Sequence, residues 1–230
     1  MLNALIVTFI AIFLVLLVRV YLSTYPGKEY NHVKFMTRIG IFSAISTILY
    51  IVKVFTIKLP FFPSFLELHF DEIPAFIAGF AYGPWAGLAV IAVKTIIKLP
   101  FTNPMAPFVG EVCDLILSSV YVFIVTFIYK KVRTLKGVAI GFAIGTVVQI
   151  VVAMILNVYV MIPFYINVAG LTAESLLIAM NAAMPAIKDI GWSYALIAVL
   201  PFNALKDLIV IIITFIVYRS LHIQLRFVRN

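Results

Sequence analysis

Apolar segments long enough to cross a lipid bilayer dominate the chain. The first of them, Leu2–Leu22, carries a single charged residue, Arg19, and has about the 20 residues that a helix needs to span the hydrocarbon core. Hydrophobic residues make up 64% of the chain, whereas a soluble domain has roughly 45–50%. The segments have helical length and lack the ten-residue alternation of a membrane barrel. They therefore predict an all-α integral membrane protein.

Six further helices are expected after this first segment. Two of them are short, so they should be tilted or lie partly inside the protein. Gly83-Pro84 separates these two because glycine suits the end of a helix and proline the first position of the next. The six expected helices span residues 35–54, 71–82, 84–99, 108–129, 137–163 and 192–221.

The connections between these helices differ in character. The loop 59–70 contains prolines but is too rich in apolar and aromatic residues for a solvated loop, so we expect it to fold back over the bundle. A proline-rich connector covers 100–107. The long loop 164–191 contains an amphipathic stretch at 174–184.

Basic residues predict how the chain sits in the membrane. The net charge is +8, and the basic residues cluster at segment ends, which indicates topology and contact with anionic lipids rather than nucleic acid. The linker 23–38, the loop 130–136 and the C-terminal residues hold ten Lys and Arg residues, and the opposite side holds Lys53, Lys58, Lys98 and Lys188. The positive-inside rule then places the C-terminus in the cytoplasm and, with seven helices, the N-terminus outside.

The last apolar segment carries an unexpected polar cluster, Asn203, Lys206 and Asp207. An ionisable side chain in the bilayer core costs roughly 2.5–3.5 kcal/mol and usually faces the bundle interior or an aqueous cavity. Asn203 and Lys206 are three residues apart and share one helical face. They form either a ligand site or a polar contact between helices. Asn157 and the loop 59–70 fall at the same outer end, which favours an outward-facing cavity.

Other polar residues suggest structural roles or none. Lys94 lies mid-helix, and we expect it to pair with Glu111 or Asp114 rather than to touch a ligand. Gly40-x-x-x-Ala44, extended by a second pair at 43 and 47, forms a small-residue stripe that could pack inside the bundle or dock another subunit.

Motifs for catalysis, nucleotide hydrolysis and metal binding are absent from the sequence. There is no glycine-rich phosphate loop followed by Lys-Ser/Thr, and no hydrolase signature. Cys113 is the single cysteine, so no intrachain disulfide can form, and the histidines lack metal-ligand spacing. We therefore expect a protein that is not an enzyme and holds no metal or cofactor. A stand-alone secondary transporter stays open as an alternative, although no inverted repeat is evident.

Three motifs carry a resemblance to a known family. They are the run FLELHFDEIPAFIAGFAYGPWAG at 65–87, followed by Lys94, the run NVYVMIPFY at 157–165, and PFNALK at 201–206. They resemble the substrate-binding S components of energy-coupling factor (ECF) vitamin importers, and within them the riboflavin-specific members. The resemblance covers about Phe35–Leu221.

The resemblance implies a fold and a function. The expected domains are an extra N-terminal transmembrane helix with a polar linker at 1–34, a six-helix substrate-binding domain at 35–221 and a basic cytoplasmic tail at 222–230. The ligand would be riboflavin or its phosphate FMN, as cargo rather than cofactor. The partners would be a transmembrane coupling subunit and two ATPases in the cell membrane. An S component for pantothenate, folate or a queuosine precursor is the alternative.

The resemblance also implies site residues. Asn157, Asn203 and Lys206 would hydrogen-bond the ribityl chain or the ring edge. Loop residues Phe65, Leu66 and Leu68 would cover the isoalloxazine ring. Asp71, Lys94 and Tyr165 complete the expected substrate-binding set. Gly40 and Ala44 would dock the coupling subunit.

Overall fold

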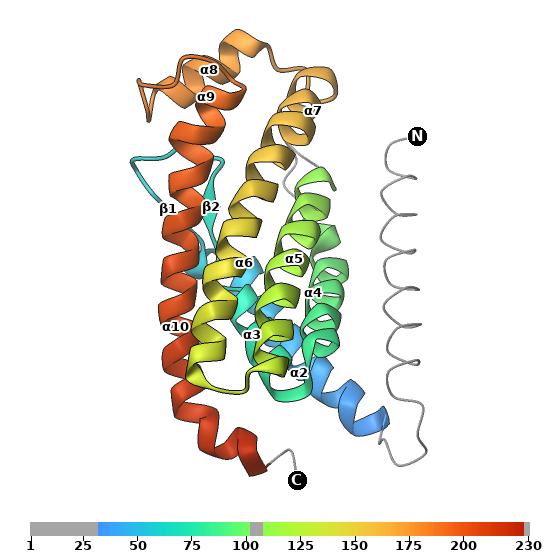
Figure 1. Cartoon of the computed structure of the whole chain (residues 1–230). Helices are drawn as coiled ribbons and strands as arrows, with labels where there is room; N and C mark the ends of the chain where they lie inside the picture. Colours follow the sequence, from blue (N-terminus) through green and yellow to red (C-terminus); the bar gives the residue numbers. More distant parts are fainter. Residues whose placement is uncertain (1–31, 102–107, 228–230) are drawn as a thin grey trace.

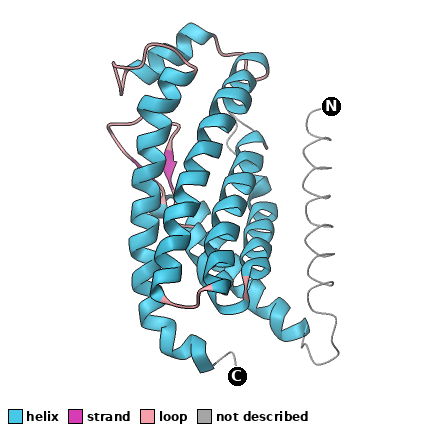
Figure 2. Ribbon diagram, in the orientation of Figure 1, coloured by secondary structure: helices cyan, strands magenta, loops and turns pink. Residues whose placement is uncertain are grey.

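Long helices lie side by side in the computed structural model, which describes residues 32–101 and 108–227 (Figure 1). Five described stretches are long and apolar enough to cross a membrane, and the helix Glu72–Tyr82 is shorter. The predicted all-α membrane bundle is therefore confirmed over these residues (Figure 2). The predicted helix Leu2–Leu22 lies outside the described residues.

The described helices and strands follow the predicted order closely. They are α2 (His32–Ile51), η1 (Lys53–Phe55), β1 (Ile57–Lys58), β2 (Glu67–Leu68), α3 (Glu72–Tyr82), α4 (Pro84–Lys98), η2 (Leu99–Phe101), α5 (Val109–Lys131), α6 (Leu135–Leu156), η3 (Asn157–Met161), α7 (Ile162–Asn167), α8 (Ala173–Asn181), α9 (Trp192–Tyr194), η4 (Ala195–Val199) and α10 (Leu200–Phe227).

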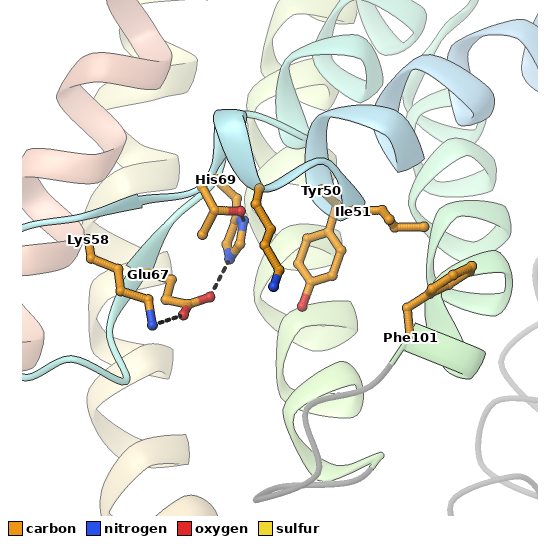
Figure 3. A pocket seen from close by; sticks show the side chains of 8 residues that line it. Tyr50, Ile51, Lys58, Glu67, His69 and Phe101 are labelled. Atoms are coloured by element: carbon orange, nitrogen blue, oxygen red, sulfur yellow. Dashed lines mark hydrogen bonds and ion pairs between the residues drawn. The ribbon is translucent and has the colours of Figure 1, made fainter.

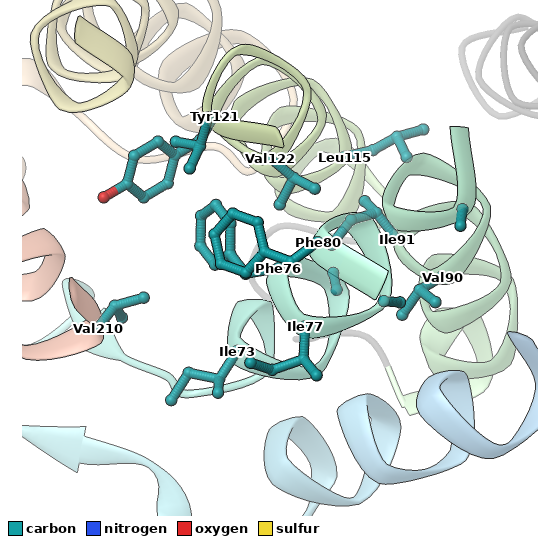
Figure 4. Packing of buried hydrophobic residues seen from close by; sticks show 14 of the residues in the cluster. Ile73, Phe76, Ile77, Phe80, Val90, Ile91, Leu115, Tyr121, Val122 and Val210 are labelled. Carbon is teal, nitrogen blue, oxygen red and sulfur yellow. The ribbon is translucent and has the colours of Figure 1, made fainter. Parts of the chain in front are cut away.

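The short helix α3 forms the centre of the bundle. Nearly every residue of α3 is buried, and its aromatic rings pack against α5, α6 and α10 (Figure 4). The Phe76 ring meets Tyr121 and Phe142 with centroids 5.0 Å apart. Phe80 lies 5.3 Å from Tyr218. Such edge-to-face pairs each add about 0.5–1.5 kcal/mol beyond the burial of apolar area. The aromatic residues of α3 therefore hold the bundle together from its centre.

Two glycines set helix geometry. Gly83 has φ +99°, where only glycine is relaxed, and it ends α3 while Pro84 opens α4, as predicted. At Gly141 of α6, an added Cβ would lie 2.8 Å from the Val125 carbonyl oxygen of α5. The two backbones therefore approach more closely than any side chain would allow.

The predicted apolar loop does fold back onto the bundle. Strands β1 and β2 pair antiparallel, with Lys58 opposite Glu67. Phe62 in the loop between them packs edge-on against Phe202 of α10, with centroids 5.4 Å apart. The prediction for 59–70 is confirmed, and the two short strands are an addition to it.

Two prolines lie inside continuous helices, and one of them was expected to mark a helix end. The sequence predicts that a helix ends at Pro163, but α7 continues to Asn167. The turn before Pro163 is the π-helix η3, in which the Ile162 N–H donates to the Asn157 carbonyl. The wider turn accommodates the proline, which lacks an N–H and clashes with the carbonyl four residues back. Pro201 follows the π-helix η4 in the same way.

Helices α7, α8 and α9 gather at one end of the bundle, and the C-terminus lies at the other end (Figure 1). Thr172 and Ser175 form a capping box that begins α8, which occupies much of the predicted amphipathic stretch.

Candidate functional site

A cavity of about 230 Å³ lies between the β1–β2 loop, α5, the η3–α7 segment and α10. Six of the predicted substrate-binding residues line it: Asn157, Asn203, Lys206, Phe65, Leu66 and Tyr165. The structure therefore brings together residues that are far apart in the sequence. The remaining lining residues are Tyr50, Glu67, His69, Gly110, Cys113, Asp114, Leu117, Met161 and Phe202.

Asn203 and Lys206 share the face of α10 that turns toward the cavity. Asn203 is 7% exposed. Its Nδ2 donates to the Val199 carbonyl at 2.8 Å, and its Oδ1 accepts from Gln149 at 3.1 Å. The Lys206 ammonium lies 3.1 Å from the Glu72 carboxylate and keeps some exposure to the cavity. The polar cluster therefore lines a cavity and also makes contacts between helices.

Asn157 belongs to the π-helix η3 on the opposite wall. Its Nδ2 donates to the Ala153 carbonyl at 2.9 Å, and its Oδ1 accepts from the Tyr194 hydroxyl at 3.2 Å. The Phe65 ring lies 6.4 Å from the Tyr165 ring and 6.0 Å from the Tyr194 ring. An aromatic surface thus adjoins the amide.

Three predicted site residues lie behind the cavity instead of lining it. Leu68 is buried in the hairpin with 1% of its surface exposed. Lys94 and Asp71 form a buried ion pair, and Lys94 also reaches Asp114 at 3.0 Å. The predicted pairing of Lys94 is confirmed with Asp114, and the pair with Asp71 is an addition to it. The family resemblance implied all three as ligand contacts, whereas here they pack the hairpin and form ion pairs behind the cavity.

The floor of the cavity is a charged network. Asp114 has its side chain 26% exposed and accepts from Lys98 at 2.7 Å as well as from Lys94. The Lys98 ammonium also lies over the Tyr50 ring, 3.9 Å from its centroid. Each buried cation therefore has an anionic partner, which an ion in the membrane requires.

A second cavity of about 680 Å³ adjoins the first and shares Tyr50, Glu67 and His69 with it (Figure 3). These three residues separate the two spaces. The Tyr50 and His69 rings lie 4.6 Å apart. Glu67 contacts Lys58 at 2.9 Å and His69 at 3.6 Å. This partition was not predictable from the sequence, because an isolated tyrosine, glutamate and histidine form no recognisable motif.

Glu67 is held in its charged form. The polar contact with the His69 ring has the largest effect, and it outweighs partial burial. Together with the Lys58 ammonium it lowers the pKa of Glu67 to about 2.

Helix α2 presents a small-residue face away from the cavity. Gly40 and Ala44 are exposed, and a Cβ added at Gly40 would have no neighbour within 4 Å. Ser43 and Thr47 are buried instead, so the predicted stripe divides between two faces. Gly40 and Ala44 therefore form the exposed half of the stripe.

The cavity suits a small molecule with a largely apolar body. Its walls combine aromatic and aliphatic surface with a few fixed polar groups, which is the usual composition of a small-molecule site. Within 32–101 and 108–227, no group of three His, Cys, Asp or Glu side chains could hold a metal ion.

Comparison with known proteins gives one consistent picture. The family described as ECF transporter, substrate-specific component, matches residues 34–218. The riboflavin transporter FmnP of Bacillus subtilis is 27% identical over 186 residues, which is 80% of this chain and 91% of that protein. The riboflavin transporter RibU of Staphylococcus aureus is 29% identical over 85% of this chain and 95% of its own. A solved structure of the S component of a bacterial ECF transporter superposes with a TM-score of 0.65 at 27% identity. The match covers 85% of this chain and 99% of that one.

Proposed function

Because the chain belongs to the family of ECF transporter substrate-specific components, we propose that it captures riboflavin or FMN and delivers it inward with an ATP-driven module. The observation that carries this proposal is the cavity walled by Asn157, Asn203 and Lys206 beside the aromatic loop. Transporters named for riboflavin match most of the chain.

The chemistry of the cavity supports a flavin. Riboflavin has a flat amphipathic ring and a neutral polyol tail, so it needs apolar walls and a few hydrogen-bonding groups. Two amides and an ammonium supply those groups here.

The size of the site is compatible with a flavin that occupies both cavities. Ligand sites usually have volumes of about 300–1,000 Å³, and the 230 Å³ cavity alone is below that range. Together with the adjoining 680 Å³ space it falls within the range. The partition of Tyr50, Glu67 and His69 would then lie beside the bound ligand.

Delivery to the cytoplasm needs partners, in our proposal a transmembrane coupling subunit and two ATPases. The η3–α7 segment and the β1–β2 loop, which line the cavity, lie in the half of the bundle near α8 and α9, and the basic loop 130–136 lies at the opposite end with the last turns of α10 (Figure 1). With the C-terminus in the cytoplasm, the cavity faces outward. The exposed Gly40/Ala44 face of α2 would receive the coupling subunit. ATP hydrolysis in the partners would then reorient the component so that its site faces inward.

A flavin titration tests the proposal. Detergent-purified protein should show flavin absorbance, or quench riboflavin fluorescence at near-stoichiometric concentrations. Asn203→Ala and Lys206→Ala should each raise the Kd about tenfold or more, because each removes a hydrogen bond to the ligand. Gly40→Leu, on the opposite exposed face, is the matched control and should bind normally. Colourless protein without quenching would reject riboflavin and direct the search to other vitamins.

A further inference from the structure

Both asparagine amides of the cavity have their orientation fixed by backbone. Nδ2 of Asn203 donates to the carbonyl of Val199, and Nδ2 of Asn157 donates to the carbonyl of Ala153. A backbone carbonyl can only accept a hydrogen bond, so the nitrogen of each amide must be the atom that faces it. The oxygen of each amide therefore points the other way.

A side chain from another helix holds each of these oxygens. Gln149 of α6 donates to Asn203 Oδ1 of α10, 3.1 Å away. Tyr194 of α9 donates to Asn157 Oδ1 of η3, 3.2 Å away. One hydrogen bond runs from α6 to α10 and the other from α9 to η3. Together they join the two walls of the cavity.

Neither of these two donors reaches the cavity itself. Gln149 is 0% exposed and Tyr194 is 1% exposed, and neither is among the lining residues. The Oε1 of Gln149 has no hydrogen-bond partner among the described residues. Burying an amide without a hydrogen-bond partner costs free energy, and the hydrogen bond described for the Gln149 side chain is the one to Asn203.

We propose that Gln149 and Tyr194 are positioning residues that make the asparagines of the cavity wall, Asn203 and Asn157, hydrogen-bond donors toward the ligand. With its oxygen engaged from behind, each asparagine keeps one N–H for the cavity, and Lys206 adds its ammonium. Such a wall selects a ligand edge rich in acceptors, such as ring carbonyls and ring nitrogens. The identity of the ligand rests on the proposed function, whereas the positioning does not.

Double-mutant cycles test the positioning, with riboflavin as the probe. Gln149→Met should raise the Kd about tenfold in the wild-type background and less than twofold in the Asn203→Ala background. Tyr194→Phe should show the same dependence on Asn157→Ala. The matched control is Tyr129→Phe, which removes a buried hydroxyl bonded to Tyr218 at 2.7 Å far from the cavity. It should leave the Kd within twofold.

Equal effects of Gln149→Met with and without Asn203 would overturn the proposal, as would equal effects of Tyr194→Phe with and without Asn157. Thermal unfolding of the ligand-free variants gives a readout that needs no ligand. If the two substitutions of a pair change the unfolding temperature non-additively, the hydrogen bond between the two residues is supported. Additive changes contradict it. If the wild type fails to quench riboflavin while these temperatures couple, the proposed ligand is wrong and the positioning stands.

Discussion

Lys94→Met should be the most destabilising single change in the charged network. The Lys94 side chain is fully buried and bridges Asp71 and Asp114. After the substitution Asp114 keeps its contact with Lys98 at 2.7 Å, but Asp71 loses the ion pair that the structure describes for it. One buried carboxylate is thus left uncompensated, and breaking a buried pair in this way costs about 3–5 kcal/mol. For a chain of this size that is a fall of about 6–20 °C in Tm.

Two comparison variants isolate the cause. Asp71→Asn in the Lys94→Met background removes the uncompensated charge and should recover about half of the loss. Lys98→Met leaves Lys94 shared by both carboxylates, and the excess negative charge then falls on Asp114, whose side chain is 26% exposed. It should therefore cost less than Lys94→Met, although it also removes the cation–π contact with Tyr50, about 1–2 kcal/mol.

Thermal unfolding of ligand-free protein in detergent measures all of these variants. The role assigned to Lys94 is refuted if Lys94→Met unfolds within about 2 °C of the wild type. It is also refuted if Lys98→Met is equally damaging, or if Asp71→Asn restores nothing.

Three further predictions concern other parts of the molecule. Gly40→Leu should abolish copurification with the coupling subunit while the Kd for flavin stays unchanged; copurification at the wild-type level would exclude this face. Gly141→Ala should cost about 1–3 kcal/mol of stability in thermal unfolding, because its Cβ would press on the backbone of α5, whereas Gly40→Ala should cost nothing. The folded-state pKa of Glu67, about 2, lies below its ordinary value of 4.5, so its stabilising contribution is full above pH 4.5 and disappears as the pH falls toward 2. Thermal unfolding across that range should show this loss in the wild type and not in Glu67→Gln, and equal pH profiles would contradict it.

Features with a local physical cause were predictable from the sequence. Hydropathy located the spanning helices because a bilayer demands length and apolarity. Gly83-Pro84 marked the boundary between α3 and α4 because both residues have strong positional preferences. Asn203 and Lys206 pointed to an internal site because polar groups in a membrane need partners.

Features that depend on contacts between distant segments were not predictable. Asp71 and Lys94 are 23 residues apart in the sequence, and no spacing rule predicts that they pair. Gln149 is an isolated amide in a mostly apolar helix, and its contact with Asn203 forms only when α6 meets α10. Pro163 resembles a helix end in the sequence because a π turn leaves no clear mark in composition.

The π turns η3 and η4 also fix the rotational phase of the helices beyond them. In a π turn the backbone hydrogen bond closes one residue later than in an α-helix, so the turn holds one extra residue. That residue rotates the following helix by about 100° relative to an uninterrupted α-helix. Deleting one residue from η3 would therefore swing Tyr165 off the cavity wall while the helix stayed intact. The direction in which the segment beyond each π turn faces is thus set by one extra residue of the chain.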